Sequence, residues 1–156
     1  MAIGFLDFST KHAVAGSTRI KATLCGHIYN VRATDDIDNG CIIKRGDYVA
    51  PEYYAEAAAS NTFAGKIIDQ AANGNWYVEV TASDEDLLVL TVPVIYYDYN
   101  SRMAHESNFY NAAGDLMRCY ELVPGDVFEL SAEGFSGTPA KGKTVSVSNK
   151  KVTVGN

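Results

Sequence analysis

The sequence predicts a mainly β protein, a single compact β-barrel or β-sandwich with one or two short helices and an extended N-terminal arm. Val, Ile, Thr and the aromatic residues make up about a third of the 156 residues, whereas Leu, which favours helices, occurs only eight times. Several short segments alternate apolar and polar residues with the period of two that is typical of a half-buried strand. Turn-forming Asn-Gly and Gly-Asp pairs separate these segments.

The first segment, residues 1–17, shows neither a sustained hydrophobic period nor a turn signal of its own. It carries a small apolar cluster that includes Phe5 and Phe8. We expect it to be an extended arm that becomes ordered on a partner's surface or along a sheet edge. Residues 18–156 then form the β domain.

Within the domain, alternation predicts strands at residues 20–24, 76–80 and 127–130. Residues 65–70 and 75–81 flank an Asn-Gly turn and predict one hairpin, and residues 143–148 and 151–154 predict another across Asn149 and Lys150. The apolar run at 87–97 predicts a core strand that Pro93 bends or places at an edge. Only residues 51–60 and 107–113 are predicted to be helical.

The charge balance disfavours nucleic acid as a partner. Lys and Arg number 13 against 19 Asp and Glu, which gives a net charge of −6 without a basic cluster. No apolar run reaches the length of a membrane span and no signal peptide is recognisable, so we expect no membrane partner and a protein made and kept in the cytoplasm. The three cysteines lack a CxxC pair and are expected to be reduced, buried thiols.

No motif in the chain predicts an enzyme. Cys25 and His27 lie two residues apart, but with the other cysteines and histidines they match no compact zinc pattern, and nothing selects a Cys–His nucleophile pair, so we expect no metal, no cofactor and no catalytic residue. The acidic residues between Asp35 and Asp38 leave ion binding open, although no calcium-loop pattern is present. The Arg-Gly-Asp tripeptide at 45–47 is interpreted as a β-turn that leads into a strand.

One set of segments resembles the small capsid decoration (cement) proteins of tailed bacteriophages. The resemblance lies in the order of residues 39–49, 62–67, 76–80, 108–111, 118–122 and 125–128, a pattern of hydrophobic strands some of which follow an Asn-Gly or Gly-Asp pair. The resemblance covers roughly residues 20–155. It implies a non-enzymatic β domain on the outside of a virion capsid, often at three-fold points, whose N-terminal arm adds to the capsid protein's sheet.

On this basis the expected partner is the major capsid protein, with self-association as a trimer or with lattice neighbours as a further expectation. We expect the chain to stabilise the capsid lattice through many contacts that act together. The residues expected to bind the capsid are those of the arm and of a strand that pairs with a neighbour between residues 13 and 19: Ile3, Phe5, Leu6, Phe8, Val14 and Arg19.

An alternative function is a carbohydrate-binding or cell-surface-binding β module. The chain has ten tyrosines and one tryptophan, and amphipathic rings provide recognition area at low entropic cost. The residues of such a recognition surface are Tyr53, Tyr54, Trp76, Tyr97 and Tyr99. A third hypothesis is a small β-barrel enzyme that uses Asp or Glu as acid and base, but no motif in the sequence supports it.

Overall fold

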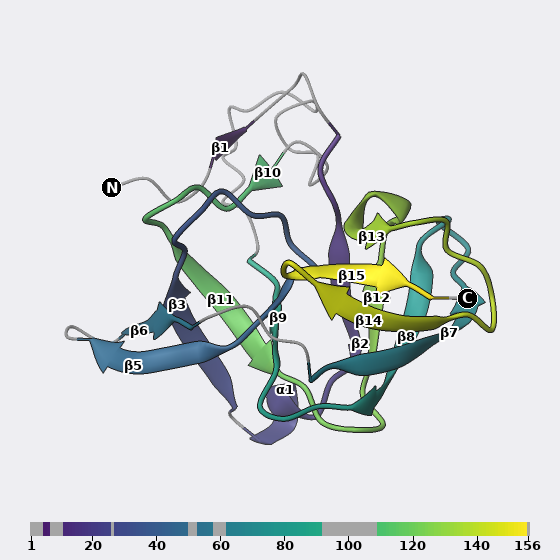
Figure 1. Ribbon diagram of the computed structural model, residues 1–156, viewed down its shortest axis with the longest axis horizontal. Helices are drawn as coiled ribbons and strands as arrows, with labels where there is room; N and C mark the ends of the chain where they lie inside the picture. Colours follow the sequence, from purple (N-terminus) through teal and green to yellow (C-terminus); the bar gives the residue numbers. More distant parts are fainter. Residues whose placement is uncertain are drawn as a thin grey trace.

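The protein is mainly β, as predicted (Figure 1). The computed structural model describes residues 5–6, 11–25, 27–49, 53–57, 62–91 and 109–155. Their strands form a six-stranded sheet, a seven-stranded sheet and a two-stranded pairing of β1 (Phe5–Leu6) with β10 (Phe109–Tyr110). The helical elements among these residues are α1 (Ala22–Cys25) and one 3-10 turn at Ala132–Gly134.

The six-stranded sheet curls into a small barrel. Its order is β4-β9-β11-β3-β6-β5, with β3 at Ile28–Arg32, β4 at Ile42–Ile43, β5 at Arg45–Val49, β6 at Tyr53–Glu56, β9 at Leu87–Val89 and β11 at Leu116–Glu121. The two edge strands, β4 and β5, follow each other in the chain with only Lys44 between them. The sheet must therefore bend round until its edges meet. Its interior is a cluster of buried residues: Val31, Ala33, Ile37, Ile43, Leu87, Val89, Met117 and Cys119.

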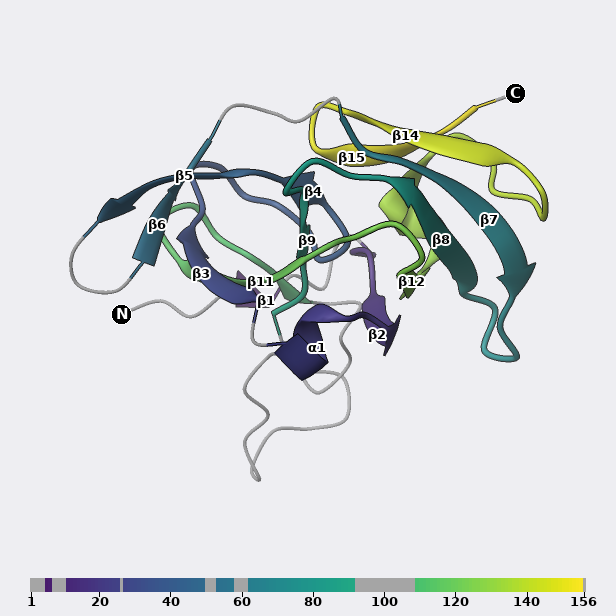
Figure 2. The ribbon, with the colours of Figure 1, turned by 90° about the horizontal axis from the view of Figure 1, so that it is seen from below.

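The seven-stranded sheet lies beside the barrel (Figures 1 and 2). Its order is β13-β15-β14-β7-β8-β12-β2, with β2 at Ala15–Arg19, β7 at Ala64–Gln70, β8 at Trp76–Ala82, β12 at Val127–Leu130, β13 at Phe135–Ser136, β14 at Thr144–Ser148 and β15 at Lys151–Val154. The barrel strands β3, β5 and β6 and the hairpin strands β7, β14 and β15 occupy opposite ends of the molecule in both views.

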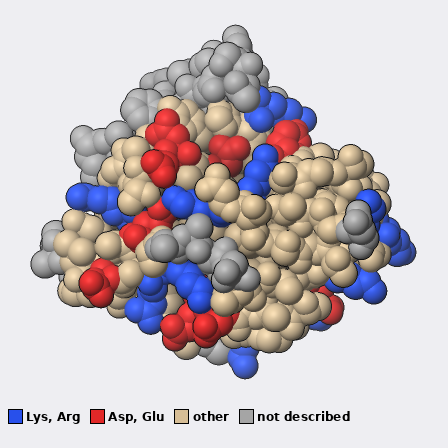
Figure 3. Space-filling model, viewed as in Figure 1, with Lys and Arg blue, Asp and Glu red and all other residues tan. Residues whose placement is uncertain are grey.

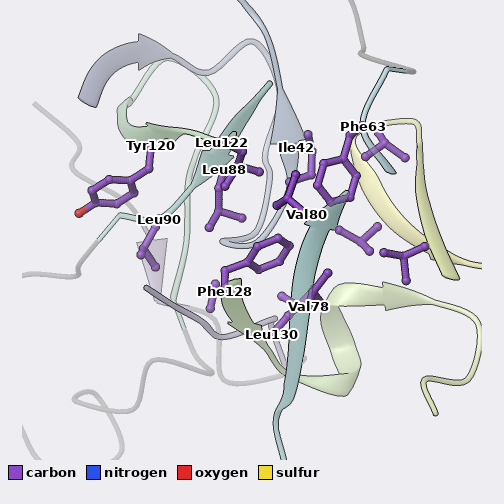
Figure 4. Close-up of a cluster of buried hydrophobic side chains, with 14 of the residues drawn as sticks. Ile42, Phe63, Val78, Val80, Leu88, Leu90, Tyr120, Leu122, Phe128 and Leu130 are labelled. Carbon is purple, nitrogen blue, oxygen red and sulfur yellow. The ribbon is translucent and has the colours of Figure 1, made fainter. Parts of the chain in front are cut away.

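The main hydrophobic core fills the space between barrel and sheet (Figure 4). Phe128, Val78 and Leu130 come from the seven-stranded sheet, while Leu88 and Leu122 come from β9 and the end of β11. Because β9 sends Leu88 into this core and its neighbours into the barrel, it is buried on both faces. Each fully buried Leu or Phe contributes roughly 1.5–3 kcal/mol, so this strand ties the two halves together.

The two predicted hairpins are confirmed. β7 pairs with β8 across residues 71–75, and β14 pairs with β15 across Asn149 and Lys150, which both have positive φ. Gly125 and Asp126 lead into β12 as expected. The run at 87–97 begins with the fully buried β9, but Pro93 and residues 92–97 lie outside the described residues.

Four local predictions are wrong. The helix expected at 51–60 is replaced by β6, and the helix expected at 107–113 by β10 and a bridge between Ile37 and Asn111. The strand expected at 20–24 contains α1. The Arg-Gly-Asp tripeptide is part of β5 and not a β-turn. In each case sheet pairing or a tertiary hydrogen bond overrides the local propensity of a short segment.

The boundary predicted after residue 17 falls inside β2. Ala13 and Ala15 are core residues, and β2 pairs with β12 along the edge of the seven-stranded sheet. The backbone of Val14 exchanges hydrogen bonds with Ser131. Residues 11–19 are therefore integrated in the folded domain.

Candidate functional site

The described thiols and imidazoles are used in packing and local pairs. Burial, followed by the charge of Asp38, raises the pKa of Cys41 to about 11, and burial also raises the pKa of Cys119. His12 Nδ1 lies 2.6 Å from Asp38 Oδ1, and His27 Nδ1 lies 2.5 Å from Glu121 Oε2. No three His, Cys, Asp or Glu side chains of the described residues are grouped to hold a metal ion. His105 and the side chain of Cys25 lie outside this description.

The acidic loop at residues 35–38 has a structural use for its carboxylates. Asp38 Oδ2 accepts a hydrogen bond from the amide of Ala13, Asp36 Oδ1 accepts one from the amide of Ala113, and Asp35 Oδ2 lies 3.5 Å from Lys150 Nζ. The loop borders a pocket of about 330 Å³ that also meets the β14–β15 turn. Its carboxylates thereby hold three neighbouring segments together.

A buried ion pair fixes the β14–β15 hairpin to the barrel. Lys150 Nζ donates to Glu56 Oε2 at 2.6 Å, and the same oxygen accepts a hydrogen bond from Thr34 Oγ1 at 2.5 Å. The Glu56 side chain is 2% exposed, and its Oε1 has no hydrogen-bond partner in the described part of the chain. The backbone carbonyl of Lys150 also accepts from the amide of Ile42 in β4. One residue therefore secures the hairpin through both its side chain and its backbone.

Burial alone lowers the pKa of Lys150, but the hydrogen bond and charge of Glu56, with a smaller contribution from Asp35, outweigh it and raise the pKa. Lys150 is consequently a stable cation and not a nucleophilic amine. The arrangement has the character of a structural clamp.

The predicted recognition residues Tyr53 and Tyr54 lie on opposite faces of β6 in the barrel, and Trp76 lies in the other sheet. Tyr54 contacts the rings of Tyr29 and Tyr48 at centroid distances of 5.5 and 5.4 Å, in edge-on geometry. Tyr53 lies under the guanidinium of Arg32, at 4.5 Å. Trp76 is in β8 of the other sheet, half-buried against the main core. Tyr97 and Tyr99 fall among the residues left undescribed.

The residues expected to bind a capsid are placed only in part. Phe5 and Leu6 form β1 and pair with Tyr110 and Phe109, while Ile3 and Phe8 lie outside the described residues. Val14 is half-buried, and Arg19 is exposed at the end of β2, opposite Val127. In the described part of the chain, no strand pairs with the outer edge of β2.

A groove lies at the end of β2 where Arg19 pairs with Val127. It has a volume of about 490 Å³ and is lined by residues of β2, α1 and the turn at 123–126, among them Arg19, Lys21 and Pro124. Leu24 lines it as well and is 88% exposed. The predicted period of two assigned Leu24 to a buried strand face, so sequence reasoning missed the most exposed large apolar side chain described.

Figure 3 shows a face on which acidic and basic side chains intermingle over the barrel half, while the area over β14 and β15 is largely uncharged. No helix of the described residues is long and apolar enough to span a membrane. No protein-family model matches the chain, and neither a curated protein nor a solved structure is significantly similar to it.

Proposed function

We propose that this chain is a non-enzymatic virion protein that binds the outer surface of a phage capsid and stabilises its lattice. The observation that carries the proposal is the edge of β2 with its adjoining groove. An edge strand exposes backbone donors and acceptors that can pair with a strand of another chain. Leu24 beside it offers apolar contact area to the same partner.

The regular part of β2 is short, so we propose that the residues before position 11 also contribute to binding. The register between β2 and β12 shifts at Thr18, which leaves Ala15–Ser17 as the regular stretch. Three residues of main-chain pairing give little affinity alone. The apolar residues before position 11 would add to it as anchors, because linked weak contacts act together.

The test is co-sedimentation with DNA-filled heads of the phage that encodes the chain. We expect the wild type to pellet at a fixed ratio to the major capsid protein. Leu24→Ser should lower occupancy by about tenfold or more, since burying a leucine is worth roughly 1.5–3 kcal/mol. Leu116→Ser, at a leucine that is 42% exposed on the barrel, is the matched control and should bind normally.

A second variant examines the N-terminal segment. Deletion of residues 2–10 removes β1 and its two-residue pairing with β10 but spares the six- and seven-stranded sheets and the core residues Ala13 and Ala15, so the domain should remain folded while particle binding is lost. Wild-type protein that stays in the supernatant would refute the capsid function. Unchanged occupancy of particles by Leu24→Ser would show that the groove takes no part in capsid binding.

A further inference from the structure

The barrel carries an arginine that is held in place but has no anionic partner among the described residues. Arg45 lies in β5 with its guanidinium carbon 4.6 Å from the ring centre of Tyr29 and 5.0 Å from that of Tyr54. No carboxylate of the described residues forms an ion pair with it, although the chain has a net charge of −6. The side chain is half-buried, and none of its nitrogens is a buried unpaired atom, so its N–H groups remain accessible.

A bulge in β5 creates this group. Arg45 pairs with Glu56 and Tyr48 pairs with Tyr54, so three steps along β5 match two along β6. Directly opposed residues share a face, and residues 54 and 56 share one because they are two apart. The extra residue thereby places Arg45 and Tyr48 on the same face as Tyr54, where a regular strand would have separated them.

The register places a carboxylate beside Arg45 with which it forms no ion pair. Its direct cross-strand neighbour is Glu56, whose Oε2 is bonded to Lys150 Nζ and Thr34 Oγ1 and whose Oε1 has no hydrogen-bond partner in the described part of the chain. The guanidinium rests instead on two tyrosine faces, which fixes its orientation by cation–π contact. A guanidinium that is already fixed in orientation loses less conformational entropy on forming hydrogen bonds than a freely rotating one does.

We propose that Arg45, with Tyr29, Tyr48 and Tyr54, is a binding site for a carboxylate side chain on an acidic segment of a partner protein. A guanidinium binds a carboxylate through two parallel hydrogen bonds. Tyr48, which is 59% exposed, extends the contact area beside it. Tyr and Arg together are the residues most enriched at the centres of protein interfaces. One guanidinium matches one carboxylate, whereas a polyanion such as nucleic acid requires clustered Lys and Arg, which the sequence lacks.

A matched control exists on the other face of the same strands. Arg32 is exposed and stacks on Tyr53. Since Val31 is opposite Tyr54, the neighbouring Arg32 and Tyr53 point away from the Arg45 face. Arg32→Gln thus removes an equally charged, tyrosine-stacked arginine without altering the proposed site.

The experiment follows the side-chain Nε–Hε signals of the full chain by NMR during titration with a capped Gly-Glu-Phe-Glu-Gly peptide at constant ionic strength. The Gly-Gln-Phe-Gln-Gly peptide differs only in charge. We expect the Arg45 signal to move, and the Glu peptide to bind about tenfold more tightly than the Gln peptide. Arg45→Gln should abolish this preference, and Arg32→Gln should keep it.

Equal binding of the two peptides, or a preference that survives Arg45→Gln, would overturn the proposal. A glucuronate oligosaccharide at the same concentration tests the alternative that the carboxylate belongs to a sugar, and tighter binding of that ligand would equally overturn it. Amide spectra of both variants establish that each is folded. The result is independent of particle binding at the β2 edge, which lies in the other sheet.

Discussion

Replacing Lys150 by methionine is expected to uncouple the C-terminal hairpin from the barrel. Methionine keeps the length and the apolar stem of the lysine side chain. Residue 150 has a φ of 69°, and because methionine and lysine both carry a Cβ, the backbone strain at this position is unchanged. Among the described residues, the change leaves Thr34 as the one hydrogen-bond donor to the Glu56 carboxylate, whose side chain is 2% exposed. The backbone hydrogen bond from Ile42 to residue 150 is retained.

The size of the effect follows from the burial of the pair. Removing one partner of a buried ion pair costs about 3–5 kcal/mol, because the remaining charge has lost its compensation. The low end applies here, since Thr34 still donates to Glu56, so we expect a loss of about 3 kcal/mol in the free energy of unfolding. With a urea m-value of about 2 kcal/mol/M, the midpoint falls by about 1.5 M.

The assay is urea unfolding followed by fluorescence and circular dichroism. Lys151→Met is the control, because Lys151 is exposed and forms no ion pair within the described structure, and it should change stability by less than about 0.5 kcal/mol. Lys150→Met combined with Glu56→Gln should recover more than half of the loss, since the buried charge is then gone. Equal midpoints for the Lys150 and Lys151 variants would refute the clamp.

The pH dependence has a definite sign. The pKa of Lys150 is raised in the folded state, so the contribution of the pair is complete below the unfolded-state pKa of about 10.4. It is lost as the pH rises through the folded pKa. The difference between wild type and Lys150→Met should therefore be constant from pH 7 to 9 and shrink above pH 10.4.

Three further predictions concern the interior. Gly65→Ala places a Cβ 2.8 Å from the backbone oxygen of Glu79 and should cost about 1–3 kcal/mol, measured by thermal unfolding, whereas Gly16→Ala meets only ordinary contacts at 3.5 Å and should cost less. Burial, ahead of the charge of Asp36, raises the pKa of Asp115, so Asp115→Asn should unfold at a higher urea concentration than wild type at pH 7. That gain should vanish below pH 3.8; a gain that persists there would contradict the assignment to ionisation. In a Cys25→Ser background, Cys41 and Cys119 should resist a thiol reagent at pH 8 until the chain is unfolded, because thiolate is scarce at a pKa of about 11 or higher; rapid labelling of native protein would contradict it.

The hairpins were predictable because their signal is local. An Asn-Gly or Asn-Lys turn between alternating strands contains within about fifteen residues both the positive φ and the register that it needs. The strand at 53–56 was not predictable in this way. Its neighbouring alanines favour a helix. The segment is nevertheless a strand because it pairs in parallel with β3, more than twenty residues earlier in the chain, and in antiparallel register with β5, in which a bulge shifts the register.

The residues of the candidate sites differ in the same way. Tyr53 and Tyr54 stand out in the sequence as an aromatic pair, whereas Tyr29, Tyr48 and Arg45 join Tyr54 only through the bulge and the β3–β6 pairing. The period of two at residues 20–24 predicted a buried face for Leu24. The prediction is wrong because the four-residue helix α1 replaces the strand there. Both the assembly of the tyrosine–arginine group and the exposure of Leu24 depend on tertiary contacts, which a single sequence does not reveal.

The clamp and the arginine site are connected through one carboxylate. Glu56 binds Lys150 Nζ through Oε2 and lies directly opposite Arg45 in the β5–β6 ladder, yet no ion pair of the described residues joins Glu56 to Arg45. Lys150 holds it because the β14–β15 turn directs its backbone carbonyl to Ile42 and its amine to Glu56 at once. The C-terminal hairpin therefore does more than extend a sheet. Lys150 is the cation that binds Glu56, while Arg45 rests on the tyrosine faces without an ion pair among the described residues, in the position from which we propose that it binds a partner's carboxylate.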